Sequence, residues 1–124
     1  MRLLVLMCGC SSMLITVEAP RNLNGERPVR MLVRAVERGE FVSDSYQQVS
    51  DKVVSKDESV LLSKPIYPGS IYSAEVKKAE KNVAIYFFFT DAGGEWKALL
   101  ETPLPYSARI VLGANTIRRV DRLH

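Results

Sequence analysis

The chain has 124 residues, 47% of them hydrophobic and 25% charged, so it is long enough for one folded domain with its own core and too short for two. The formal net charge of +3 is small, and basic and acidic residues are interspersed through most of the sequence, which argues against a nucleic-acid-binding protein. No apolar run reaches the ~18 residues that a membrane-spanning helix needs, so we expect the body of the protein to lie outside the bilayer.

The first residues have the pattern of a bacterial lipoprotein signal peptide. Arg2 is followed by the short apolar run Leu3–Met7 and then by Gly9 and Cys10. The basic residue would stay on the cytoplasmic side, the apolar run would enter the bilayer, and the small residue would admit the peptidase. We therefore predict a signal peptide over residues 1–9 and lipid attachment at Cys10. The apolar run is shorter than the ~7–15 residues usual for such segments, and the alternative is a buried first strand with two incidental thiols.

The rest of the chain offers little for catalysis or metal binding. Both cysteines, Cys8 and Cys10, lie in the signal region, so no disulfide is expected in the mature domain. The only histidine is the final residue, His124, where it makes a poor general base or metal ligand. No Ser-His-Asp arrangement, phosphate-binding glycine loop or cluster with metal-ligand spacing occurs. We therefore expect no enzymatic activity, no cofactor, no metal and no small-molecule substrate.

From Met13 onward the sequence is typical of a β protein. Residues 13–19 are rich in β-branched and apolar side chains and predict a strand. Residues 21–27 are turn-forming, because Asn and Gly tolerate positive φ. In residues 29–36, Val29, Met31, Val33 and Ala35 alternate with Arg30, Leu32 and Arg34, which predicts a half-buried strand. Residues 41–54 fit a short helix or a packed loop, with Ser43 or Asp44 as a cap.

Turns separate the remaining predicted strands at short intervals. Residues 83–90 are apolar on both faces, which predicts a strand covered on each side. The Asp91–Gly94 turn then leads into a strand over 95–101, in which Trp96 is expected to join the core. The Pro68–Gly69 pair favours a type II turn. The other predicted strands are 59–63, 71–76, 108–113 and 115–120.

About seven or eight short strands with turns every eight to twelve residues, and one weak helix, predict an all-β fold. We expect an antiparallel β-sandwich that forms a single domain over residues 10–124. One basic cluster, Arg118, Arg119 and Arg122, stands near the end of the chain. It is either a solvated tail or a contact with anionic lipid or peptidoglycan.

The order of these features resembles TssJ, the outer-membrane lipoprotein family of the bacterial type VI secretion system membrane complex. Four pieces carry the resemblance: Cys10; the first strand running into a polar loop and Arg27-Pro28; Tyr67-Pro-Gly-Ser70; and the strand 83–90 followed by Asp91-Ala-Gly-Gly-Glu-Trp-Lys97. The resemblance implies a transthyretin-like β-sandwich that is anchored by lipid to the outer membrane and faces the periplasm.

The resemblance also implies a partner and a binding loop. Family members bind the periplasmic part of the inner-membrane protein TssM through the loop between the first two strands. In this sequence that loop maps to Arg21, Asn22, Leu23, Asn24, Gly25 and Glu26. The alternative is an envelope lipoprotein that binds a small ligand or a cell-wall fragment. A scaffold should have a protruding first loop with Leu23 at its tip, whereas a binding module should have a concave, partly aromatic cavity.

Overall fold

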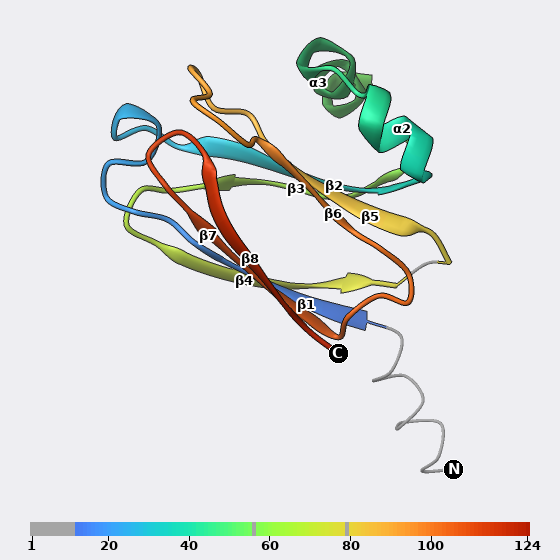
Figure 1. The fold of residues 1–124 in the computed structure, drawn as a ribbon. Helices are drawn as coiled ribbons and strands as arrows, with labels where there is room; N and C mark the ends of the chain where they lie inside the picture. Colours follow the sequence, from blue (N-terminus) through green and yellow to red (C-terminus); the bar gives the residue numbers. More distant parts are fainter. Residues whose placement is uncertain (1–11, 56, 79) are drawn as a thin grey trace.

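The computed structural model describes residues 12–55, 57–78 and 80–124. In these residues, two four-stranded sheets pack face to face, and two helices lie above the outer face of one sheet (Figure 1). The strands are β1 Ser12–Glu18, β2 Val29–Val36, β3 Val60–Ile66, β4 Ile71–Lys77, β5 Asn82–Phe87, β6 Lys97–Leu100, β7 Ser107–Leu112 and β8 Ile117–Leu123. The predicted all-β sandwich is confirmed.

The strand order is β4-β1-β7-β8 in one sheet and β3-β2-β5-β6 in the other. Five of the six pairs are antiparallel, as predicted, and β1 pairs with β7 in parallel. The parallel pair puts β1 in the middle of its sheet, hydrogen-bonded on both sides, with Leu14 opposite Ser107 of β7 and Glu75 of β4. The first strand of the domain is therefore held by two ladders.

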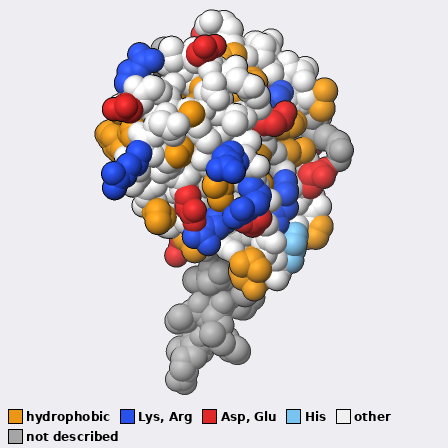
Figure 2. Space-filling model, turned by 60° about the vertical axis from the view of Figure 1, so that its left-hand side comes forward, with side chains coloured by type: hydrophobic (Ala, Val, Ile, Leu, Met, Phe, Trp, Pro, Cys, Tyr) orange, Lys and Arg blue, Asp and Glu red, His pale blue; other side chains and the backbone are white. Residues whose placement is uncertain are grey.

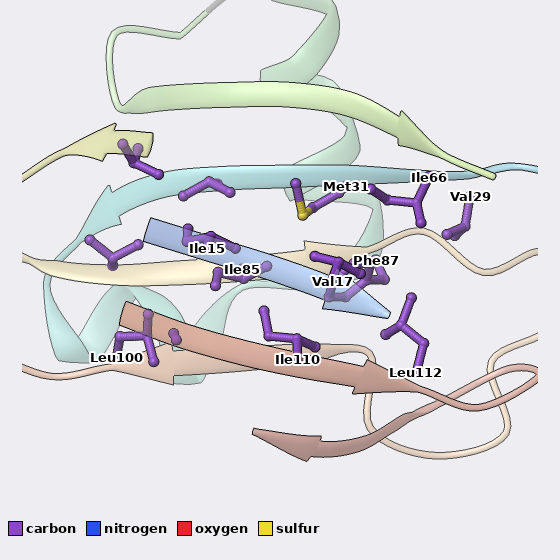
Figure 3. Close-up of a cluster of buried hydrophobic side chains, with 14 of the residues drawn as sticks. Ile15, Val17, Val29, Met31, Ile66, Ile85, Phe87, Leu100, Ile110 and Leu112 are labelled. Atoms are coloured by element: carbon purple, nitrogen blue, oxygen red, sulfur yellow. The ribbon is translucent and has the colours of Figure 1, made fainter. Parts of the chain in front are cut away.

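The main core lies between the two sheets. Alternate residues of β1 and β2 point inward, among them Ile15, Val17 and Met31, and each is fully buried. They meet Ile85 and Phe87 of β5 (Figure 3). Burial of one such side chain contributes roughly 1.5–3 kcal/mol, so this layer supplies most of the stability of a domain in which the described residues contain no disulfide.

A second, smaller core lies on the outer face of the β3-β2-β5-β6 sheet. It contains Leu32 and Val36 of β2 with Ala84 and Tyr86 of β5 and Val49 from the helices. The prediction that β2 is only half-buried is wrong, because the helices cover the face that carries Leu32 and Arg34, and Arg34 is only 1% exposed. The prediction that the run 83–90 is covered on both faces is confirmed for residues 83–87, which lie in β5, whereas Thr90 is exposed.

Two helices occupy the region where the sequence predicts one short helix or a packed loop. They are α2 Arg38–Ser43 and α3 Tyr46–Ser55. Neither Ser43 nor Asp44 caps α3. Instead, Ser45 and Gln48 form a reciprocal capping box, with Gln48 N–H donating to Ser45 Oγ at 3.2 Å and Ser45 N–H donating to Gln48 Oε1 at 3.0 Å. No helix in the described ranges has the length and apolar character needed to cross a membrane.

Several strands have bounds that differ from the prediction. β3 continues through Pro65 to Ile66, beyond its predicted end at residue 63. Proline is tolerated there because β3 is an edge strand, so no ladder partner is missing on its outer side. β5 ends at Phe87 rather than at Thr90, and β6 begins only at Lys97, so the connection between them is longer than the predicted turn.

The strand directions separate the molecule into two ends. The loops β1–β2, β3–β4, β5–β6 and β7–β8 all lie at one end, on the left of Figure 1. Ser12, where the described chain begins, lies at the other end, close to the last residues of β8 (Figure 1). We call these the loop end and the Ser12 end.

Candidate protein-interaction site

The loop between β1 and β2 forms a compact turn at the loop end. Leu23–Gly25 make a short 3₁₀ helix, which begins with Leu23 N–H donating to Pro20 O at 3.1 Å. Three successive residues, Asn24, Gly25 and Glu26, have positive φ values of 48°, 66° and 64°. Asn and Gly adopt this conformation at little cost, whereas Glu26 does so only because the surrounding contacts impose it.

The apolar residue of the loop does not lie at its tip. Leu23 is fully buried in the main core, so the prediction of an exposed Leu23 is wrong. The reason is that the 3₁₀ turn folds the middle of the loop back over the open end of the sandwich, where an aliphatic side chain fills space between the sheets. The exposed residues of the predicted binding set are Arg21, Asn22, Gly25 and Glu26. The exposed part of this set is therefore polar, with one positive and one negative side chain, and the exposed Arg27 next to it adds a second positive charge to the loop.

Asn24 fastens the loop to the two neighbouring loops. Its side-chain Oδ1 accepts a hydrogen bond from Thr90 N–H at 2.8 Å, and its Nδ2 donates to Pro28 O at 3.0 Å. Its backbone N–H donates to Ala114 O at 2.6 Å. Asn24 is only 8% exposed, so these bonds are shielded from water. The β1–β2, β5–β6 and β7–β8 loops are thus connected through one residue.

A hollow of about 320 Å³ lies where these three loops meet. Six of its eight lining residues have polar side chains and none is aromatic, which does not match the partly aromatic cavity expected of the ligand-binding alternative. The lining residues are Asn22, Asn24, Gly25, Arg27, Thr90, Asp91, Ala114 and Asn115. Asp91 and Asn115 were not predicted as site residues. The turn-forming residues around them predicted only that they lie in loops.

The β3–β4 turn completes the loop end. Gly69 has φ of 73° and Ser70 N–H donates to Tyr67 O at 3.2 Å, consistent with the predicted type II turn. Gly69 N–H donates to Pro20 O at 3.0 Å, which holds the turn against the first loop. Tyr67 is 57% exposed beside it. Exposed tyrosines are enriched in protein interfaces, so Tyr67 joins the candidate site, although the sequence analysis did not select it for binding.

The other conspicuous group is a buried polar cluster beneath α2, and its role is structural. Arg34 donates to Asp44 Oδ2 at 2.7 Å, to Tyr86 Oη at 3.3 Å and to Ser59 Oγ at 3.0 Å. Tyr86 Oη also donates to Asp44 Oδ2 at 2.5 Å, and burial together with this bond raises the pKa of Tyr86. Every buried side-chain polar atom among the described residues has a partner, so the cluster presents no free group to a substrate.

Trp96 and Lys97 belong to this structural group. Trp96 packs against both cores, as predicted, with its ring 5.3 Å from that of Tyr46 and 5.7 Å from that of Tyr86. Lys97 Nζ donates to the backbone oxygens of Phe41 at 2.6 Å and Asp44 at 3.1 Å. The Trp-Lys pair therefore ties the helices to the sheet. The predicted lipid-attachment residue, Cys10, lies outside the described residues.

Comparisons with known proteins agree on the fold. Residues 30–112 match the model of the family described as IglE, N-terminal domain. The Lip protein of Serratia marcescens, a membrane-bound component of the type VI secretion system, is 18% identical with a TM-score of 0.70, covering 92% of this chain and 99% of that chain. The type VI lipoprotein TssJ1 of Pseudomonas aeruginosa is 20% identical with a TM-score of 0.71, covering 92% and 97%.

A chain in the structure of the type VI protein TssM C-terminal domain (869–1107) from EAEC is 14% identical, with a TM-score of 0.71 and coverage of 87% of this chain and 96% of that chain. No curated protein matches this sequence. The TssJ-like fold that the resemblance implies is therefore confirmed at low sequence identity. Because the matching family model spans most of the domain from β2 to β7, the chain belongs to the IglE N-terminal domain family.

Proposed function

We propose that this protein is a lipid-anchored periplasmic scaffold of a type VI secretion membrane complex. In this proposal Cys10 carries the lipid that holds the domain to the outer membrane, and residues 1–9 are removed as a signal peptide. The polar loop end binds the periplasmic part of a TssM-type inner-membrane protein. The protein makes and breaks no covalent bond in this role. The fold shared with Lip and TssJ1 supports the proposal.

The observation that carries the proposal is the separation of the two ends. The chain enters the domain at Ser12, two residues after the proposed anchor, and the β1–β2 loop lies at the opposite end of β1 (Figure 1). A domain anchored at the Ser12 end would direct its four loops away from the membrane. That is the arrangement a tether needs, because the partner then approaches from the periplasm without competing with lipid for the same surface.

The position of β1 suits a tether that carries load. β1 connects the proposed anchor directly to the proposed binding loop, and it lies between β4 and β7 in the middle of its sheet. A pull along β1 would have to shear both ladders at once, from Ser12 opposite Lys77 to Glu18 opposite Ile71 on one side. The bonds of Asn24 spread the same load to two further loops. A strand at the edge of the sheet would resist with one ladder only.

The anchor is tested by Cys10→Ser in the native host. We expect the protein to leave the outer-membrane fraction and to appear in the soluble periplasmic fraction, because the acyl chains supply the membrane affinity at roughly 0.8 kcal/mol per buried methylene. Unchanged sedimentation with outer membranes would contradict acylation at this residue. The mass of the amino-terminal peptide of the unaltered protein gives an independent measurement of the lipid.

The binding loop is tested with surface substitutions only, because replacing Leu23 or Asn24 would disturb the core. The double variant Arg21→Glu/Glu26→Lys reverses the two exposed charges of the predicted binding set, and we expect it to lose co-purification with a TssM periplasmic fragment. The matched control, Lys64→Glu/Glu80→Lys, makes the same charge changes at exposed positions outside the loop. Equal binding by both variants would place the interface elsewhere, and no binding even by the unaltered domain would favour the ligand-binding alternative.

A further inference from the structure

An exposed apolar patch at the Ser12 end is not used by the proposed scaffold function. Leu14, Tyr106 and Leu123 are 40%, 59% and 60% exposed. Leu14 pairs with Ser107 across β1 and β7, and Ser107 pairs with Leu123 across β7 and β8, so the residues form one row on the outer face of the sheet. Tyr106 directly precedes β7 at the same end of the sheet, where Leu14 N–H donates to Tyr106 O at 2.9 Å and Tyr106 N–H donates to Leu123 O at 3.0 Å, so its exposed side chain lies beside the row.

The patch is hollowed and has charged neighbours of both signs. A depression of about 260 Å³ lies over Leu14, Ser107 and Leu123. Hydrophobic and basic side chains lie together toward the lower end of the described surface in Figure 2. Near the patch, Arg109 pairs with Glu18, and Arg119 pairs with Asp121 at 3.0 Å. The charges are largely balanced, so the apolar side chains rather than a net charge distinguish this surface.

The distance to the proposed anchor restricts what can cover the patch. Only one residue separates Cys10 from Ser12, and consecutive Cα atoms are 3.80 Å apart, so Ser12 Cα lies within about 8 Å of the acylated residue. Leu14 is two residues farther along β1, which adds about 7 Å at most. A lipid-bearing Cys10 lies at the boundary between headgroups and acyl chains, and the headgroup layer is about 5–7 Å thick. The Ser12 end therefore cannot leave the membrane surface.

We propose that the apolar patch of Leu14, Tyr106 and Leu123 at the Ser12 end is a lipid-contacting surface that sets the orientation of the domain on the membrane. This inference rests on the proposed acylation of Cys10. Tyrosine is favoured at the membrane interface because its ring is apolar and its hydroxyl is polar, and the two leucines can enter the headgroup layer beside it. The acyl chains hold the protein at the membrane, and the patch fixes which way the loop end points.

The test uses the acylated protein in phosphatidylcholine vesicles that contain a lipid with a nitroxide near its headgroup. Because an acylated Cys10 has no free thiol, Ser107→Cys can be labelled selectively with bimane, and Ala92→Cys at the loop end gives the matched control. We expect bimane at position 107 to be quenched several-fold more strongly than bimane at position 92. Equal quenching at the two positions would overturn the proposal, even if no further variant folds.

A second comparison distinguishes the effect of the apolar patch from the effect of the acyl chains on Cys10. In the variant Leu14→Glu/Tyr106→Glu/Leu123→Glu, the protein should still sediment with vesicles, but the domain should lose its fixed orientation, so the difference in quenching between positions 107 and 92 should shrink several-fold. The control Tyr67→Glu/Ile71→Glu changes two exposed apolar residues at the loop end and should leave that difference unchanged. An undiminished difference in the patch variant would overturn the proposal.

The remaining outcomes also decide the matter. If quenching at position 107 is absent and light scattering finds a dimer that the patch variant dissociates, a second copy of the chain covers the patch, and the lipid proposal is wrong. The mass of the amino-terminal peptide distinguishes a failure of the proposed anchor from a failure of the proposed lipid surface. An unmodified Cys10 overturns both the scaffold anchor and the lipid surface, whereas an acylated Cys10 without quenching overturns only the lipid surface.

Discussion

The buried Arg34 cluster gives the sharpest prediction about stability. We consider Arg34→Met in a Cys10→Ser background, which removes the guanidinium and keeps most of the side-chain length. Asp44 is only 9% exposed and would then keep Tyr86 as its remaining side-chain partner. Breaking a buried ion pair on one side costs about 3–5 kcal/mol, because the other charge stays buried and uncompensated. Glu40 adds little, since its side chain is 47% exposed.

The assay is urea unfolding, followed by the tryptophan fluorescence of Trp96. With a slope of about 1–3 kcal/mol per molar urea, the expected loss lowers the midpoint by roughly 1–5 M at unchanged slope. Arg119→Met is the matched control, because Arg119 makes a 3.0 Å pair with Asp121 on the surface, with side chains 63% and 47% exposed. Such exposed pairs contribute about 0–1 kcal/mol.

A compensated variant tests the cause of the loss. Arg34→Met/Asp44→Leu/Tyr86→Phe removes the whole network and leaves no buried charge or unpaired hydroxyl, so it should recover most of the stability lost in the single variant. If Arg34→Met costs no more than Arg119→Met, the reasoning from burial is refuted. If the triple variant is less stable than Arg34→Met, the cost comes from lost packing or hydrogen bonds and not from an isolated charge.

Three further predictions concern single positions. Leu23→Ala should lower the free energy of unfolding in urea by about 2–5 kcal/mol because it leaves a cavity in the core. The control Val42→Ala changes a side chain that is 73% exposed and should cost almost nothing. Equal losses in the two variants would mean that Leu23 is not buried. Gly69→Ala should lower stability by roughly 1–2 kcal/mol because its φ is 73°, whereas Gly39→Ala in α2, where an added Cβ meets nothing within 4 Å, should be neutral or stabilising. Hydrogen bonds from Ser59 lower the pKa of Asp57 from 3.8 to about 2, so the ionised carboxylate stabilises the fold above pH 3.8 and that contribution is lost as the pH falls toward about 2. Asp57→Asn should therefore lose less stability than the unaltered domain between those two pH values, and identical acid titrations would contradict the assignment.

The strand pattern could be predicted from the sequence because it depends on neighbours along the chain. The alternation in residues 13–19, the two-sided apolar run at 83–87 and the Pro68–Gly69 turn each follow from local preferences, and each is found in the structure. The predicted end of β3 was wrong because β3 lies at the edge of its sheet, where a proline can be accommodated inside a strand. Pro65 ends a strand in most sequence patterns, yet it lies inside β3 because no strand pairs on that side.

Burial at the candidate site depended on contacts that no local pattern records. Leu23 belongs to a polar loop in the sequence, but the fold turns it into the core. Arg34 alternates with apolar residues as a solvent-facing side chain would, but two helices cover it and supply Asp44 as its partner. Tyr67, Asp91 and Asn115 come from three separate connections and meet the first loop only at the loop end.

The sequence by itself determined that this is a small β protein, with a lipoprotein-like start and a polar first loop, because those features depend on residue type and spacing over a few positions. Only the tertiary structure decided which side chains of that loop are exposed, why an arginine is buried, and that the Ser12 end carries an apolar patch opposite the loops. The physical reason is that burial and surface grouping depend on which strands and helices pack together, and residues far apart in the chain decide that packing.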